Sequence, residues 1–152
     1  MFPQDAHRRH DFVHQTARRL VNQYGLIAVE KLNIENMSKR PKPKQDEETG
    51  EYLPNGASQK SGLNKSIADA SWGMFRRVLA SKAESAGRKY VEVDPRWTSQ
   101  DCSGCGTRVK KKLSQRVHFC PQCGLSLDRD TNAALNILKI GMGQHTVVGI
   151  PA

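Results

Sequence analysis

The sequence predicts an α/β fold that carries a small cysteine-bearing module. Helix-like patterns alternate with short strand-like runs along the 152 residues. The four cysteines all fall within 22 residues in the C-terminal third of the chain. No apolar run approaches the roughly 18 residues that a membrane-spanning helix needs. We therefore expect one core of ordinary domain size with a small appendage, and no membrane partner.

The first expected elements are a helix and a strand. Apolar residues recur at steps of three and four over residues 5–24, which is typical of an amphipathic helix. Gly25 follows as a stop signal. The continuous apolar run 26–29 (LIAV) is typical of a short buried strand, and it ends at Glu30.

The composition changes over residues 38–62, where prolines, glycines and charges replace large apolar side chains. We expect a mobile loop or insertion there. Helical periodicity returns over residues 64–86, and residues 89–93 alternate as a strand does before Pro95 ends it.

The cysteine module is expected over residues 98–124, followed by a last helix over residues 131–139 with Asp130 as its N-cap. The tail from residue 141 to 152 is small and apolar, and we expect it to be disordered.

The cysteines form two pairs with a two-residue spacer, Cys102/Cys105 and Cys120/Cys123, and a glycine follows each pair. Two such turns can direct four sulfurs at one ion, which gives the closed tetrahedral shell of a structural zinc site. A closed shell leaves no open position for chemistry, so this zinc is expected to fold the chain. Free or disulfide-bonded cysteines are the alternative.

The charge balance favours a polyanionic partner. Lys and Arg number 24 against 15 Asp and Glu, a formal net charge of +9. The surplus is concentrated on the cysteine-bearing segment, and the strip between the two cysteine pairs is a candidate nucleic-acid contact. Its basic residues are Arg108, Lys110, Lys111 and Lys112. The same strip is equally compatible with a solvated hairpin tip.

Two acidic positions are candidates for binding a divalent metal. Glu30 stands at the end of an apolar strand, and Asp130 stands at the start of the last helix with Asp128 two residues before it. Carboxylates placed in this way often assemble a catalytic metal site. Each has a simpler alternative, since Asp130 can be only a helix cap and Glu30 only a surface residue.

Four ordered motifs resemble the C-terminal part of the TnpB (OrfB) proteins of insertion sequences, and more distantly type V CRISPR effectors and Fanzor proteins. The motifs are residues 29–34 (VEKLNI), 97–106 (WTSQDCSGCG), 120–124 (CPQCG) and 128–137 (DRDTNAALNI). The similarity runs from about residue 7 to residue 140 and includes residues 64–72 (NKSIADASW).

This resemblance implies a partial RuvC-like (ribonuclease H-type) nuclease domain with an inserted zinc ribbon, from a transposon-encoded, RNA-guided DNA endonuclease. It implies DNA and guide RNA as partners. In the family three carboxylates hold two Mg²⁺ ions; Glu30 matches the second carboxylate and Asp130 the third, with Asp128 as the second choice for the third.

One departure from the family pattern is the lack of its first catalytic aspartate, which lies on an early strand in a Gly-Ile-Asp-Leu-Gly-like context. The segments that handle guide RNA and target recognition are also missing. The chain resembles the last third of a family member, and we expect it to hold Mg²⁺ poorly and to be inactive alone. The missing N-terminal part of the nuclease is a further expected partner.

The expected organisation is a partial nuclease domain over residues 1–97, a zinc ribbon of the target nucleic-acid-binding type over 98–127, the last nuclease motif over 128–140, and the tail. Three functions remain open: a nuclease fragment, a zinc-ribbon protein that binds DNA or RNA without cutting it, and a protein-interaction piece. The N-terminus does not resemble a signal peptide, so we expect a cytoplasmic protein.

Overall fold

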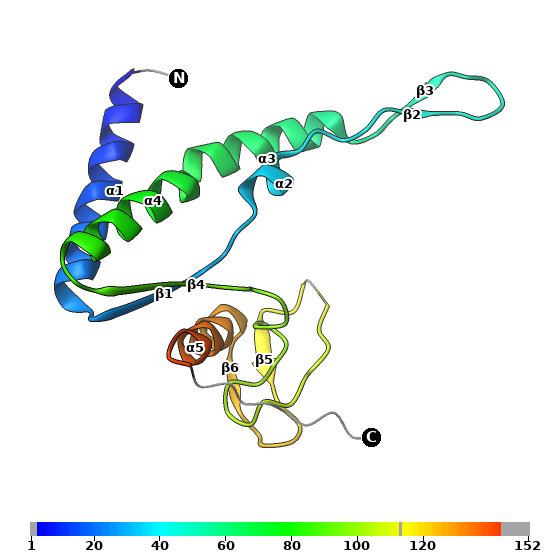
Figure 1. Cartoon of the computed structure of the whole chain (residues 1–152). Coiled ribbons are helices and arrows are strands. Elements are labelled where there is room, and N and C mark those ends of the chain that lie inside the picture. The colour runs from blue at the N-terminus through cyan, green and yellow to red at the C-terminus, as the bar shows by residue number, and fades with distance from the viewer. Residues whose placement is uncertain (1–2, 113, 144–152) are drawn as a thin grey trace. The chain divides into compact units, whose positions relative to one another are not determined.

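The computed structural model describes residues 3–112 and 114–143, which divide into two compact units (Figure 1). The first unit comprises residues up to Arg19 together with Asn33–Lys82. The second comprises Leu20–Leu32 and the residues from Ala83 onward. Within the described residues, no helix has the length and apolar character needed to cross a bilayer.

The first unit is built mainly from helices. Helix α1 (Pro3–Gln23) buries Val13 and Ala17, one turn apart, as the apolar periodicity predicts. Its Arg9 pairs with Asp69 of α3 (Ala57–Ala70) at 3.3 Å. The short helix α2 (Ile34–Ser38) also contacts α3, because the Asn64 amide donates to the Ser38 carbonyl oxygen at 2.7 Å.

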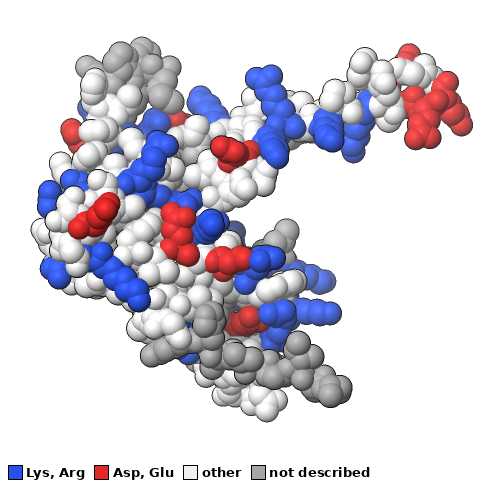
Figure 2. All heavy atoms as spheres, viewed as in Figure 1, with Lys and Arg blue, Asp and Glu red and all other residues white. Residues whose placement is uncertain are grey.

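Residues 38–62, expected as a loop, contain a small antiparallel hairpin of β2 (Lys44–Gln45) and β3 (Tyr52–Leu53), and the start of α3. The hairpin turn is closed by Asp46, whose Oδ1 accepts hydrogen bonds from the Glu48 and Thr49 amides at 2.9 Å each. Figure 2 shows acidic side chains gathered at the hairpin tip and basic ones along its stem. Local hydrogen bonds of this kind leave no trace in apolar periodicity, so the sequence pattern missed them.

The single helix expected over residues 64–86 is wrong, because the structure has two helices, α3 and α4 (Trp72–Ser85). Ser71 separates them in the left-handed conformation, at φ +54° and ψ +28°. Its N–H donates to the Ala68 carbonyl oxygen, which is how a helix C-terminus is commonly closed. Serine carries no strong stop signal, and the apolar stripe continues across it.

The second unit contains a parallel pair of strands, β1 (Leu26–Glu30) and β4 (Lys89–Val93), in register from Leu26↔Lys89 to Glu30↔Val93. Both predicted strands are thereby confirmed. Helix α5 (Arg129–Gly141) packs against this pair with Ala133 and Ile137 buried. The contact is so close at Gly141 that an added Cβ would lie 2.6 Å from the Cβ of Ala28.

The cysteine module of this unit includes an antiparallel hairpin of β5 (Val117–Phe119) and β6 (Ser126–Asp128), which leads directly into α5. The expected N-cap at Asp130 is wrong. Because the extended chain of β6 continues to Asp128, that residue is the cap, and its Oδ1 accepts from the Asp130 and Thr131 amides at 2.8 and 3.1 Å. The expected tail begins inside the helix, at Gly141; its residues 144–152 lie outside the described residues.

A candidate metal centre joined to an acidic helix start

The four cysteine sulfurs form one cluster, with all four Sγ atoms within 4.8 Å of one another. The Sγ atoms of Cys102 and Cys123 are 3.6 Å apart, as are those of Cys105 and Cys120. These separations far exceed a disulfide bond of about 2.05 Å. They match the edge of about 3.8 Å that four thiolates make around a tetrahedral zinc ion at about 2.3 Å. Four cysteines are therefore positioned for metal binding.

Both cysteine turns share one backbone design. The N–H groups of Gly106 and Gly124 donate to the carbonyl oxygens of Cys102 and Cys120 at 2.8 and 2.9 Å. These glycines have φ of +80° and +74°, a conformation that residues with a Cβ adopt only under strain. The glycine after each pair is thus required by the turn that brings its two sulfurs together.

The crowded thiols compete for protons. Hydrogen bonds with the side chain and the backbone of Thr107 lower the pKa of Cys105 to about 6. The Leu125 amide acts to lower the pKa of Cys123, but the hydrogen bond with Cys105 and burial outweigh it and raise this pKa to about 12. Four thiolates cannot be held this close together without a cation. A divalent, thiophilic ion removes the conflict by neutralising all four, so the donor set fits such an ion.

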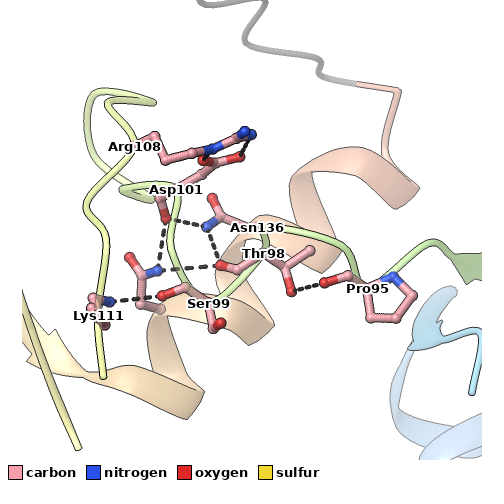
Figure 3. Close-up of polar contacts among 8 residues, drawn as sticks. Pro95, Thr98, Ser99, Asp101, Arg108, Lys111 and Asn136 are labelled. Carbon is pink, nitrogen blue, oxygen red and sulfur yellow. Dashed lines mark hydrogen bonds and ion pairs between the residues drawn. The ribbon is translucent and has the colours of Figure 1, made fainter. Parts of the chain in front are cut away.

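Helix α5 is joined to the first cysteine turn by side-chain amides, as Figure 3 shows for Asn136. The Asn136 Nδ2 donates to the carbonyl oxygens of Thr98 and Asp101 at 2.8 and 2.7 Å. The Asn132 Nδ2 donates to the same two oxygens at 3.4 and 2.8 Å. Two amide groups with two N–H bonds each thus meet two carbonyl oxygens with two lone pairs each. We call this arrangement the amide clamp.

The clamp extends along one face of the helix. The Asn132 Oδ1 accepts from the Ser103 amide at 2.9 Å, and Asn132 is fully buried. One turn beyond Asn136, the Lys139 Nζ donates to the Ser103 carbonyl oxygen. Asn132 and Asn136 belong to the family-like motif at residues 128–137, but the sequence predicted no role for them or for Lys139. Their spacing of four and three positions on a largely apolar helix was the signal that could have found them.

Lys111 and His118 lie against each other inside the ribbon. The Lys111 Nζ donates to the Ser99 carbonyl oxygen at 2.7 Å and to Nδ1 of His118, which is fully buried. Burial lowers the pKa of His118 and the Lys111 charge lowers it further, so its ring is neutral and accepts this bond. Lys111 is therefore turned inward, whereas Lys110 and Lys112 are exposed.

The two candidate catalytic acids belong to the same unit. Glu30 is half-buried at the end of β1, opposite Val93 of β4. Asp130 lies in the first turn of α5, where its side chain is 74% exposed and meets the Arg129 Nε at 3.2 Å. Among the described residues, the cysteine cluster is the one group of three or more Cys, His, Asp or Glu residues close enough to hold an ion. The described acids therefore supply no complete three-carboxylate site.

Comparison with known proteins places these features in a family. The family model for the Cas12f1-like TNB domain matches residues 72–137. The putative RNA-guided DNA endonuclease InsQ of Escherichia coli is 35% identical over 137 residues, which cover 90% of this chain and 33% of InsQ. The TnpB-like protein L79 of Acanthamoeba polyphaga mimivirus is 29% identical over 132 residues, covering 87% of this chain and 22% of the viral protein. The chain thus spans a third or less of the length of these relatives.

A solved structure supports the fold. The Cas12f1–sgRNA–target DNA complex, determined by cryo-electron microscopy, contains a protein that aligns with a TM-score of 0.56 and 21% identity. The alignment covers 88% of this chain and 34% of that protein. It confirms the expected fold class, an α/β, partial RuvC-like domain with an inserted four-cysteine ribbon. The sequence similarities identify the chain as a member of the TnpB family.

Proposed function

We propose that the chain is the C-terminal part of an RNA-guided DNA endonuclease with a RuvC-like site, and that it cannot cleave DNA alone. One observation carries the proposal. Helix α5, which is capped by Asp128 and has Asp130 in its first turn, is hydrogen-bonded to the first cysteine turn and packs on the strand pair in which Glu30 ends β1. Under this proposal residues 1–97 and 128–140 belong to the nuclease domain and 98–127 form the ribbon.

The chain's own residues would each hold one part of the site. The cluster of Cys102, Cys105, Cys120 and Cys123 would hold a structural zinc ion. Glu30 and Asp130 would hold Mg²⁺ together with an aspartate that this chain does not supply. Magnesium, when bound, supplies activation of water and charge stabilisation at the scissile phosphate. With two carboxylates the site is incomplete, because Mg²⁺ is held weakly by few protein ligands.

The partners that follow are target DNA, guide RNA and the remaining part of a nuclease. The net charge of +9 suits the first two. We assign the protein to the cytoplasm, where thiols stay reduced and available for metal.

The test is a cleavage assay with Mg²⁺ on labelled single-stranded DNA, using the zinc-loaded chain alone and with the N-terminal two-thirds of a relative such as InsQ and its guide RNA. We expect no cleavage by the chain alone and cleavage when the second part is added. Glu30→Ala and Asp130→Asn should each abolish that cleavage. Robust Mg²⁺-dependent cleavage by the chain alone, lost in Glu30→Ala, would contradict the proposed incompleteness.

A second candidate is a non-catalytic zinc-ribbon protein that binds DNA or RNA. It is favoured by the high exposure of Asp130 and by the lack of a three-carboxylate group among the described residues. Under this alternative Asp130→Asn leaves nucleic-acid affinity unchanged, and adding the second part restores no cleavage that depends on Glu30. A protein-interaction piece, in contrast, would show no salt-dependent binding to nucleic acid.

A further inference from the structure

Trp97 is an exposed aromatic residue in a backbone conformation that a large side chain rarely adopts. It lies in the turn between β4 and the first cysteine pair, with φ +68° and 51% of its surface exposed. Its carbonyl oxygen accepts hydrogen bonds from the Gln100 and Asp101 amides at 2.8 Å each, which hold this turn. A bulky residue at positive φ persists only where its surroundings fix it, and such strain is concentrated at functional sites.

Arg108 covers the indole of Trp97 and is itself locked in place. Its Cζ lies 4.4 Å from the ring centroid. The Asp101 carboxylate accepts from Arg108 Nε at 2.7 Å and from Nη2 at 3.1 Å, a two-point contact that fixes the plane of the guanidinium (Figure 3). The ring is therefore preorganised, and a ligand that stacks on it loses little side-chain entropy.

Packing alone does not account for this arrangement. An indole that contributed only to core packing would be buried, yet 51% of the Trp97 surface is exposed although Arg108 covers one part of the ring. Two cations flank it: Arg108 lies over the ring, and the preceding residue, Arg96, has a side chain that is 79% exposed and pairs with Asp94. Figure 2 shows basic side chains projecting from the ribbon, interspersed with acidic ones. An open aromatic ring beside exposed cations is the combination that binds unpaired bases and their phosphates.

We propose that Trp97, backed by Arg108, is a stacking platform for an unpaired base of single-stranded DNA. The inference rests on the proposed function and adds a binding site for the strand to be cut. DNA is favoured because the turn that carries Trp97 is clamped to α5 through the Thr98 and Asp101 carbonyl oxygens, and α5 carries Asp130. A strand held on Trp97 is thereby held on the same body as the candidate catalytic acid.

The experiment uses the full zinc-loaded chain and the fluorescence of Trp97 itself. The chain has two tryptophans, so Trp72→Phe leaves Trp97 as the single indole. Short single-stranded DNA, the same sequence as RNA, and the DNA duplex are titrated at several salt concentrations. We expect single-stranded DNA to quench Trp97, with weaker quenching by RNA and none by duplex, in which the bases are already stacked.

Affinity is then measured for Trp97→Gly and Trp97→Tyr with labelled DNA. Glycine removes the ring and takes φ +68° without strain, so this variant should fold and keep its zinc. We expect Trp97→Gly to bind single-stranded DNA about 5- to 150-fold more weakly, the range for losing one base–aromatic stack. Trp97→Tyr should retain most of the affinity, and Trp72→Phe should match the unaltered chain.

Three results would overturn the platform. They are an unquenched Trp97 in the DNA-bound chain, an affinity unchanged in Trp97→Gly, and quenching by RNA or duplex equal to that by single-stranded DNA. None of them bears on the nuclease assignment, which is judged by the cleavage assay with the Glu30 and Asp130 variants. Conversely, quenching and weakened binding in Trp97→Gly support the platform even if the second part of the nuclease restores no cleavage.

Discussion

The two cysteine turns share a backbone but differ in what surrounds them. Each closes on a glycine at positive φ and contributes two sulfurs to one cluster. The first turn is tied to α5 by the amide clamp and by Lys139, and its Cys102 and Ser103 are buried. The second turn connects β5 to β6, and its Cys123 is exposed. The two turns therefore have different structural roles. The first holds helix α5 and contributes two sulfurs to the cluster, and the second contributes the other two sulfurs.

Replacing a cysteine should have the largest effect, and the same effect in both turns. Cys102→Ser and Cys123→Ser each remove one of four thiolates, so both chains should lose stoichiometric zinc and the ordered ribbon. Zinc binding contributes ~10–16 kcal/mol to the folding of small zinc domains, which explains the expected severity. Zinc-to-protein ratio and far-ultraviolet circular dichroism measure the outcome. One zinc per chain in either variant would contradict a four-thiolate site.

A substitution in the amide clamp should reduce stability much more than a matched substitution in the second cysteine turn. Asn136→Asp removes both N–H donors and brings a carboxylate against the Thr98 and Asp101 carbonyl oxygens. We expect a loss of about 2–4 kcal/mol in the free energy of unfolding. Gln122→Glu makes the same chemical change at an exposed position of the second turn and should cost less than about 0.5 kcal/mol. Urea unfolding of both zinc-loaded variants measures the difference. Equal losses in the free energy of unfolding would show that the amide clamp does not stabilise the fold.

Alanine at the two turn glycines should have matched, intermediate effects. Gly106→Ala and Gly124→Ala each force a Cβ into the left-handed region, at a cost of roughly 1–2 kcal/mol. An added Cβ at Gly124 meets nothing within 4 Å, so its loss measures backbone strain alone. Urea unfolding midpoints of the zinc-loaded variants provide the comparison. A much larger loss at one glycine would show that the two backbones are not equivalent.

The smallest effect should be at the start of α5, where Asp128→Ala removes the cap and Asp130→Ala does not. Hydrogen bonds from the Thr131 and Asp130 amides lower the pKa of Asp128 below 3.8. Its contribution is therefore present above pH 3.8 and is lost as the pH falls through the lower folded value. Thermal unfolding at neutral pH should show a lower midpoint for Asp128→Ala only. A larger loss for Asp130→Ala would reverse the assignment of the cap.

Much of the fold and the cysteine cluster could be predicted because both depend on local patterns. The two strands follow from runs of apolar or alternating residues, and the cluster follows from the repeated two-residue spacer and glycine. Glu30 and Asp130 follow as metal-binding candidates from their positions at a strand end and a helix start. Only the resemblance to a family assigns them catalytic roles, and those roles stay a prediction.

The missed features depend on hydrogen bonds between segments distant in sequence, or on the backbone of single residues. The amide clamp pairs Asn136 with a carbonyl oxygen 35 positions earlier, and no periodicity encodes such a pairing. Ser71 interrupts a helix without glycine or proline. The cap moved from Asp130 to Asp128 because β6 reaches further than its apolar residues indicate.

The parallel pairing of Leu26 with Lys89 sets an order for the folding of the second unit. To form the β1–β4 pair, the chain must close a loop that contains every residue between the two strands. The conformational entropy lost on closing this loop opposes pairing before any strand contact forms. The ribbon's cysteines, by comparison, meet over a short stretch of chain. We therefore expect the ribbon to acquire its metal early in refolding and the β1–β4 pair to assemble afterwards, so that Glu30 is among the last groups to reach its native position.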